Sequence, residues 1–220
     1  VLDPVGVGAS SFRKQTAEQL LKEVRFDAIR GNISEIKTLA SLCGTQEKNS
    51  GNMAVSDTMD VEKITDKSDH CGKITGIDGS GRGVDADNAD TVTEENLAQH
   101  ISNAKMLSKK LQTIVAITGA IDLVTDGSSC YVIRNGNPQM GHVTGAGCQL
   151  SGILTAFLAA NPENKLQAAA AAVCMMGYAG ELAAEKSGQS GSGTYRVSLM
   201  DAVSCMDGDI LERGARYEIR

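Results

Sequence analysis

The amino-acid sequence predicts an α/β fold in which an open, mostly parallel sheet is flanked by helices on both faces. Two observations carry this prediction. Short apolar runs of strand type alternate along the chain with longer stretches of helical periodicity, an order typical of sheets covered by helices. Asp, Gly and Thr stand in the loops where the strands end, and such loops hold the ligand sites of open α/β sheets. We therefore expect one domain over residues 1–220, with a site in one crevice.

The first part of the chain supplies a strand end and three further elements. Residues 1–3 are typical of the end of a strand, because Pro4 and Gly6 stop it. Apolar spacing then predicts a helix at about 13–24, a short strand at 27–30 and a helix at 34–42. Since the sequence starts without Met and as though inside a strand, we expect that an N-terminal part of the natural protein is absent from it.

The segment from Gly44 to about Asp90 differs from the rest in composition. It is rich in Asp, Lys, Ser, Thr and Gly, and its apolar runs are short. We interpret residues 44–90 as a polar insertion into the single domain, with room for one hairpin, rather than as a second domain.

The remaining residues supply the central strands and the longest helices. Thr91 and Glu94 have the spacing of a capping box ahead of a helix that ends near Leu111. Asp126-Gly127 is typical of a hairpin turn between two strands. Strands are predicted at 113–118, 122–125 and 130–133, and helices at about 148–160 and 165–187. Residues 195–206 and the charged tail after them are expected to form one more strand or helix end.

Composition excludes several classes of function. The chain has 21 basic and 27 acidic side chains, so its net charge of −6 argues against a nucleic-acid partner. Its longest uncharged apolar run, at about 150–161, is too short to span a bilayer, which argues against a membrane protein. Six cysteines without a C-x-x-C pair favour reduced thiols in a cytoplasmic protein over a disulfide framework or a zinc site.

The glycine loop Val143-Thr144-Gly145-Ala146-Gly147-Cys148 is the strongest functional signal. Its two glycines allow a tight turn and a close approach to a ligand, and helical spacing follows it. A helix start presents free N–H groups and a partial positive charge, which bind anions and favour thiolate in a cysteine of the first turn. The alternative is an ordinary turn with a small buried cysteine.

Further polar residues follow predicted strands or open predicted helices, and we expect them to converge on that loop: Asp3, Arg30, Asn32, Glu35 and Thr118. Carboxylates organise Mg²⁺, while Arg and N–H groups neutralise charge on a moving phosphoryl group. These are the parts of a phosphoryl-transfer site. Each has an ordinary structural alternative: a turn cap for Asp3, a first-turn helix acid for Glu35 and a strand residue for Thr118. His142, near the loop, is expected to be a rim or core residue.

Four motifs together resemble the hydroxyethylthiazole kinase family of thiamine biosynthesis and salvage. They occur in the family's order: Leu2-Asp3-Pro4-Val5-Gly6, Ile29-Arg30-Gly31-Asn32-x-x-Glu35-Ile36, Ala116-Ile117-Thr118-Gly119 and Val143-Thr144-Gly145-Ala146-Gly147-Cys148. The resemblance implies a ribokinase-like fold and ATP-dependent phosphorylation of the hydroxyl of 4-methyl-5-(2-hydroxyethyl)thiazole. It also implies a homotrimer with the thiazole bound at the subunit interface.

The resemblance implies a role for six residues of this chain. Cys148 matches the catalytic position, Arg30 and Thr118 match ATP-contacting positions, and Gly145 matches a substrate-contacting one. Asp3 and Glu35 match acidic positions near Mg²⁺. The family's N-terminal portion, which contributes contacts to the thiazole, has no counterpart in this sequence.

Two other functions stay open at this point. Hydroxymethylpyrimidine kinase, of the same fold, shares a similar Gly-x-Gly-Cys loop, although Arg30-Gly31-Asn32 and the motif at 2–6 favour the thiazole enzyme. The third possibility is a non-catalytic chain that binds nucleotides.

Overall fold

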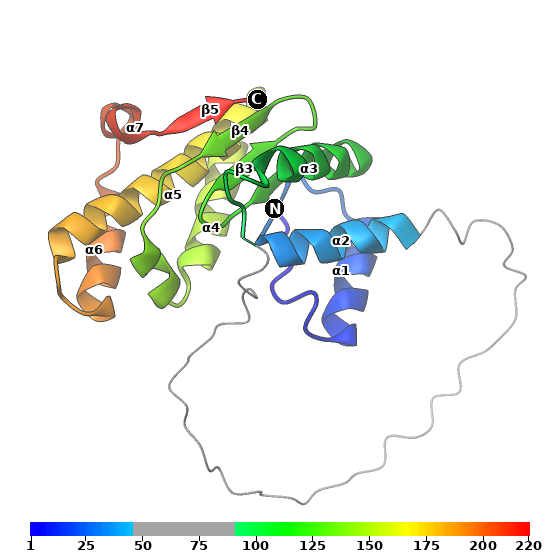
Figure 1. Ribbon diagram of the computed structural model, residues 1–220, viewed down its shortest axis with the longest axis horizontal. Helices are drawn as coiled ribbons and strands as arrows, with labels where there is room; N and C mark the ends of the chain where they lie inside the picture. Colours follow the sequence, from blue (N-terminus) through cyan, green and yellow to red (C-terminus); the bar gives the residue numbers. More distant parts are fainter. Residues whose placement is uncertain (46–90) are drawn as a thin grey trace, which may run out of the picture.

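The structure, a computed structural model, describes residues 1–45 and 91–220. Figure 1 shows the elements in chain order. They are α1 (Ser11–Glu23), β1 (Ala28–Gly31), α2 (Ile33–Thr45), α3 (Leu97–Leu111), β2 (Ile114–Ile117), β3 (Asp122–Thr125), β4 (Cys130–Ile133), the 3-10 helix η3 (Pro138–His142), α4 (Ala146–Ala160), α5 (Lys165–Ser187), α6 (Ser192–Ser204), α7 (Gly208–Gly214) and β5 (Tyr217–Ile219). The expected insertion at 44–90 lies almost wholly outside the described residues, so it stays a prediction.

Among the described residues, five strands form one sheet in the order β1-β2-β3-β4-β5. β1 and β2 are parallel, and Leu2 adds a parallel bridge to Ile29 at the outer edge of β1. The other three pairings are antiparallel. The sheet is therefore mixed rather than mostly parallel, because β2, β3 and β4 follow one another through turns too short to hold a crossover helix.

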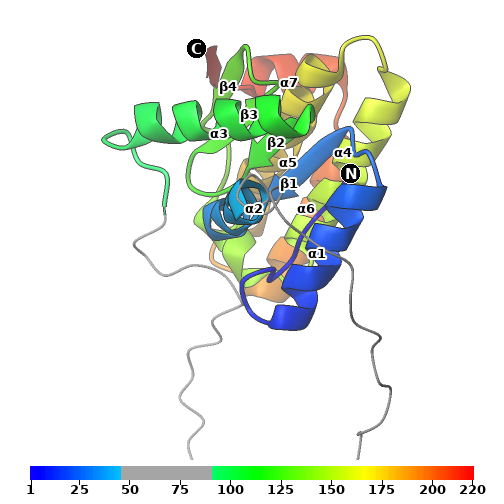
Figure 2. The ribbon, with the colours of Figure 1, turned by 90° about the vertical axis from the view of Figure 1, so that its right-hand side faces the viewer.

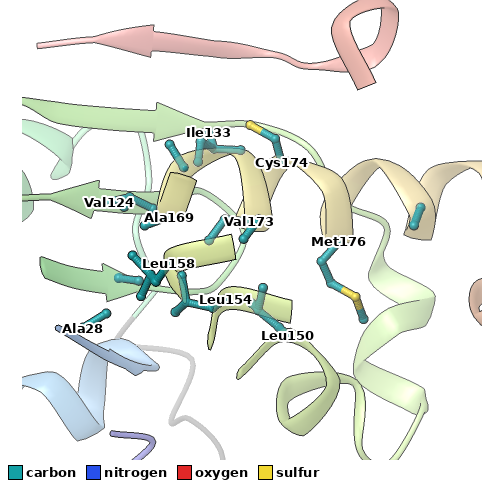
Figure 3. Packing of buried hydrophobic residues seen from close by; sticks show 14 of the residues in the cluster. Ala28, Val124, Ile133, Leu150, Leu154, Leu158, Ala169, Val173, Cys174 and Met176 are labelled. Atoms are coloured by element: carbon teal, nitrogen blue, oxygen red, sulfur yellow. The ribbon is translucent and has the colours of Figure 1, made fainter. Parts of the chain in front are cut away.

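Helices cover both faces of the sheet, as predicted (Figure 2). On one face α4 and α5 lie against alternate strand residues, and α6 lies behind α5. Figure 3 shows this layer, in which Leu150, Leu154 and Leu158 of α4 point towards Ala28 and Val124 of the strands. On the other face α1, α2 and α3 bury Ile29, Val115, Leu123 and Val132. This alternation places neighbouring strand residues in opposite layers, as the pleat requires.

The start of α3 differs from the prediction. The capping box of Thr91 and Glu94 is wrong, because the helix begins at Leu97 with Asn96 as its N-cap residue. The Asn96 side chain instead accepts from the amide of Thr93 and donates to the carbonyl of Thr91. Glu94 reaches across to a neighbouring strand end, where its carboxylate accepts two hydrogen bonds from the Arg134 guanidinium. The preceding turn therefore delays the helix by about one turn.

α5 is the central helix of the fold. Among the described residues it is the one helix long and apolar enough to cross a membrane by length and composition, but 72% of its apolar window is buried inside the protein. Gly177 and Gly180 allow its close contacts, as the sequence indicates. A Cβ at Gly177 would lie 2.7 Å from the carbonyl oxygen of Asn135, and one at Gly180 would lie 2.4 Å from the sulfur of Met140. A core position explains the length and composition of α5.

Candidate active site

Three of the predicted site residues lie together at the carboxyl ends of the two parallel strands. Arg30 is in β1, and Thr118 follows β2. Asp3 follows the bridge residue Leu2, whose amide and carbonyl bond to β1 on both sides of Ile29. The parallel edge of the sheet thus brings three distant segments to one point, although most of the sheet is antiparallel.

The Arg30 guanidinium is the centre of this group. Its Nη2 donates to the Thr118 hydroxyl at 2.9 Å, and its Nη1 donates to Asp3 Oδ2 at 3.2 Å. Both charged side chains are about 15% exposed, so water screens their attraction only in part. Arg30 Nε and Asp3 Oδ1 are buried without a hydrogen-bond partner among the described residues. A buried polar atom without a partner is costly, and at a functional site it indicates a missing ligand.

The glycine loop opens α4, as predicted. Gly145 is the N-cap residue with φ of +94°, a left-handed conformation that only glycine adopts without strain. The first helical bond runs from the amide of Gln149 to the carbonyl of Gly145. The amides of Gly147 and Cys148 therefore have no acceptor within the described part of the chain. They form the anion-binding end of the helix.

Gly147 is needed for a different reason from Gly145. A Cβ at this position would lie 2.9 Å from Nη1 and 3.1 Å from Nη2 of Arg30. The guanidinium therefore rests against the backbone of the first turn of α4. The second glycine of the loop serves this close approach, and a positive charge stands beside the free amides as a result.

Cys148 stands next to Gly147 in the same turn, and its side chain is exposed. The structure thus places this thiol at the rim of the anion-binding end of α4. Cys130, Cys174 and Cys205 are free as well. His142 is exposed in η3, on the rim of the loop, as expected.

Glu35 uses its carboxylate to accept hydrogen bonds from backbone amides rather than from the side chains of the site. Its Oε1 accepts from the amide of Gly6 at 2.7 Å, and its Oε2 accepts from the amide of Asn32 at 2.9 Å. The Asn32 side chain accepts from the Glu35 amide in return, which makes a reciprocal capping box at the start of α2. Glu35 therefore fixes the turn after Asp3 against β1. Its predicted role at a metal ion stays a prediction.

Ser151 was not among the residues predicted from the sequence. Its hydroxyl lies 2.7 Å from Asp3 Oδ2 and 3.2 Å from the carbonyl oxygen of Gly147. A signal for it exists in the sequence, because Ser151 follows Cys148 by three residues and must share its face of the helix. A lone helical serine carries too little information to be selected on that ground.

Asp122, which supports the turn next to Thr118, was also not predicted from the sequence. Its Oδ1 accepts from the amide of Gly119 at 2.8 Å, which ties the start of β3 to the turn after Thr118. Burial raises the pKa of this carboxyl to about 7, against the lowering effects of the Gly119 bond and of the nearby Arg30 charge. Asp122 therefore keeps its proton to a higher pH than an exposed carboxyl does.

Glu181 of α5 fixes the approach to the glycine loop. Its Oε1 accepts from the amide of Gly136 at 2.8 Å and from the Asn135 side chain at 3.1 Å, and two Arg216 nitrogens donate to its carboxylate. Burial acts to raise the pKa of Glu181, but these hydrogen bonds outweigh it and the pKa is lowered. The charged carboxylate therefore anchors the segment that leads through η3 to Gly145.

The group of Arg30, Asp3 and Thr118 is mostly buried, and neither of two large cavities among the described residues adjoins it. Two cavities, of about 520 and 530 Å³, lie elsewhere. One is lined by Tyr131, Cys174 and Tyr217, and the other by Asp27 and Thr113, which precede β1 and β2. Site chemistry, and not cavity size, therefore identifies the candidate site.

The residues present fit a magnesium ion that is shared with phosphates. The described residues hold no cluster of three or more acidic, His or Cys side chains. Mg²⁺ in phosphoryl-transfer sites usually needs only one or two carboxylates, together with substrate phosphates and water. Asp3 Oδ1, buried and without a hydrogen-bond partner in the described part of the chain, has the chemistry of such a ligand.

Comparison with known proteins gives a consistent result. The model of the "Hydroxyethylthiazole kinase family" matches residues 1–70 and 59–209. The chain is 44% identical to a hydroxyethylthiazole kinase of Clostridium acetobutylicum over 99% of its own length and 67% of the relative's. It is 36% identical to one from Desulfovibrio desulfuricans, over 100% and 67% of the two lengths.

A solved structure, of a hydroxyethylthiazole kinase protein from Pyrococcus horikoshii, confirms the fold. It matches with a TM-score of 0.69 at 24% identity, over 100% of this chain and 64% of the other. The chain thus spans about two thirds of the length of the relatives that it matches. The family and the fold inferred from the four motifs are confirmed, and the chain belongs to the hydroxyethylthiazole kinase family.

Proposed function

We propose that the protein transfers the γ-phosphoryl group of ATP to the hydroxyl of 4-methyl-5-(2-hydroxyethyl)thiazole. The observation that carries this proposal is the Arg30 guanidinium, which rests on Gly147 beside the free amides of Gly147 and Cys148. Two N–H groups and a fixed positive charge at one point match the charge that develops on a transferred phosphoryl group. The names of the relatives supply the acceptor alcohol.

Five of the six residues with an implied role act directly in the proposed reaction. Arg30 and the α4 amides hold the phosphates, and Thr118 orients Arg30 through its hydroxyl. Asp3 is the residue that would hold Mg²⁺, and the ion would supply neutralisation of the phosphate charge. The alcohol oxygen bonds to the γ-phosphorus as the bond to the β-phosphate oxygen breaks, and ADP leaves. The sulfur of Cys148 acts as the base that takes the proton of the alcohol. The backbone at Gly145 contacts the thiazole.

The exposed residues at the rim of the site support a proposal about the oligomeric state. Cys148 is exposed, and Val5, two residues after Asp3, is 52% exposed. Phosphoryl transfer needs water excluded from the reacting atoms, and the described part of the chain leaves the loop uncovered. We propose that a neighbouring subunit of a homotrimer covers it, in a protein of the cytoplasm.

The Cys148 substitutions test the proposed reaction directly. Replacement by Ala removes the base, so kcat with hydroxyethylthiazole falls about 10²- to 10⁴-fold, while ATP binding stays close to wild type. Phosphorylated thiazole and ADP are measured together, so that ATP hydrolysis is not taken for transfer. Cys148→Ser keeps a hydrogen-bonding atom, although one of lower basicity, so its kcat falls less than that of Cys148→Ala.

Cys205→Ala is the matched control, since Cys205 is also exposed and free but lies at the end of α6. Its kcat stays at the wild-type value. Hydroxymethylpyrimidine, offered as a competing acceptor, separates the two kinase activities. A protein that binds ATP but phosphorylates neither alcohol contradicts the proposal, as does a Cys148→Ala variant with undiminished kcat.

A further inference from the structure

Ser151 lies in the second turn of α4 and links two parts of the site that come from opposite ends of the chain. Helical spacing puts its hydroxyl on the same side as the first-turn residues Gly147 and Cys148. A helical serine ordinarily bonds back to the carbonyl four residues earlier, and the 3.2 Å contact to Gly147 is of this kind. The 2.7 Å contact to Asp3 is shorter, and it crosses 148 residues of sequence.

As a result, the two carboxylate oxygens of Asp3 differ in their hydrogen bonding. Oδ2 accepts from the Ser151 hydroxyl and from Arg30 Nη1, so both of its donors belong to the protein. Oδ1 is buried and has no partner in the described part of the chain. Two donors on one oxygen fix the rotation of the carboxylate about its last bond, and the other oxygen is left to point at a ligand.

The backbone near Asp3 is held by the bridge of Leu2 before it and by the bond of Glu35 to the Gly6 amide after it. Leu2 forms an isolated bridge to Ile29 and not a full strand. Pro4, which follows, has no N–H to donate. The link from Ser151 ties this short segment to the anion-binding end of α4 and so sets the distance between the two.

We propose that Ser151 is a positioning residue, which orients the Asp3 carboxylate towards the metal-nucleotide and holds it in register with the first turn of α4. The proposal rests on the proposed kinase function for its effect on catalysis, but its effect on Mg²⁺-dependent nucleotide binding is independent of the acceptor. Outer residues that orient a metal ligand commonly contribute 10- to 100-fold to metal affinity or activity.

The test compares Ser151→Ala with Ser151→Thr and with Thr155→Ala. Thr155 is the matched control, because its exposed hydroxyl lies one turn further along α4 and bonds only to the carbonyl of Ser151. Binding of ATP is measured by calorimetry at a series of Mg²⁺ concentrations, and kcat and KM are measured with hydroxyethylthiazole. Thermal unfolding shows whether each variant is folded.

We expect Ser151→Ala to raise the Mg²⁺ concentration for half-maximal ATP binding about tenfold and to lower kcat, while the KM for the thiazole changes little. Ser151→Thr retains the hydroxyl and restores both values to near wild type. Thr155→Ala behaves as wild type. In combination with Asp3→Asn, Ser151→Ala adds little further loss, because it acts through the group already removed.

Three outcomes overturn the proposal: an unchanged Mg²⁺ requirement in Ser151→Ala, equal losses in Thr155→Ala, or additive losses with Asp3→Asn. A wild-type protein that binds Mg²⁺ and ATP as described but phosphorylates no thiazole overturns the proposed function alone. If Ser151→Ala unfolds, Ser151→Cys takes its place, because the thiol fills a similar volume but is a weak hydrogen-bond donor; an unchanged Mg²⁺ requirement in this variant also overturns the proposal.

Discussion

At the scale of single residues, glycine is required at the two loop positions for different physical reasons. Gly145 meets nothing within 4 Å where a Cβ would stand, but its φ of +94° strains any other residue. Gly147 has no positive φ, and its restriction comes from the Arg30 guanidinium against it. The sequence pattern predicts a close backbone approach but does not say what approaches, since the partner lies 117 positions away in the chain.

Gly147→Ala tests this contact. The added methyl group displaces the flexible end of Arg30, so the fold is retained, but the guanidinium leaves its place beside Thr118 and Asp3. We expect the KM for ATP to rise about tenfold, since hydrogen bonds to charged groups contribute roughly 1.5–3 kcal/mol. Steady-state kinetics at varied ATP give this value.

Gly152→Ala is its control on the same helix. A Cβ at Gly152 meets nothing within 4 Å, and its φ is not positive. We expect an unchanged KM for ATP and a free energy of unfolding higher by about 0.5–1 kcal/mol, because alanine is the better helix former. A normal KM in Gly147→Ala would remove the assigned role of the contact.

At the scale of elements, the turn from β2 to β3 is held by the carboxyl of Asp122 on the amide of Gly119. Burial raises the folded-state pKa of Asp122 to about 7 from its ordinary value near 4. The folded protein therefore binds this proton more tightly than the unfolded chain does. The stabilisation by this group is full below about pH 4 and is lost as the pH rises to about 7.

Asp122→Asn tests this dependence on pH. The side-chain oxygen of Asn still accepts from Gly119, but it carries no proton to lose. Between pH 4.5 and 7.5 we expect the wild-type free energy of unfolding to fall relative to that of the variant by roughly 1.4 kcal/mol for each unit of raised pKa. Urea unfolding at several pH values measures it. Parallel curves for the two proteins would assign the slope to other groups.

Elements with strong periodicity could be predicted from the sequence, and weak ones could not. The strands at 122–125 and 130–133 and the helix at 165–187 have the predicted bounds. The fold class gave a mostly parallel sheet, whereas the pairings from β2 to β5 are antiparallel; the hairpin turn between β3 and β4 was predicted. β5, in the charged tail, was not distinguished from a helix end, because three residues with exposed Tyr217 and Ile219 carry no burial pattern.

Some residues of the candidate site could likewise be predicted from the sequence, and others could not. Asp3, Arg30 and Thr118 could be selected because they follow strands, and the rule that strand ends converge then brings them together. Ser151 and Asp122 lie inside a helix and a strand, where the sequence does not show which way a side chain points or what it meets. Contacts between distant segments are tertiary information.

At the scale of the whole molecule, the proposed trimer is open to measurement. Apolar side chains remain exposed on the described surface, among them Val5 two residues after Asp3, Phe12 at the start of α1, and Val197 and Met200 on α6. We expect light scattering after gel filtration to give three times the mass of one chain, and dilution to lower the specific activity as subunits part. Full specific activity in a monomer would show that no neighbour completes the site.

The link between Ser151 and Asp3 also bears on how the protein folds. It closes a loop of almost 150 residues, and contacts of that separation form only after a large loss of chain entropy has been repaid by other interactions. The carboxylate therefore takes its place only once α4 has docked on the sheet. The active site therefore forms late in folding. When denatured protein is diluted from denaturant, we expect the helical circular-dichroism signal to recover before the activity does.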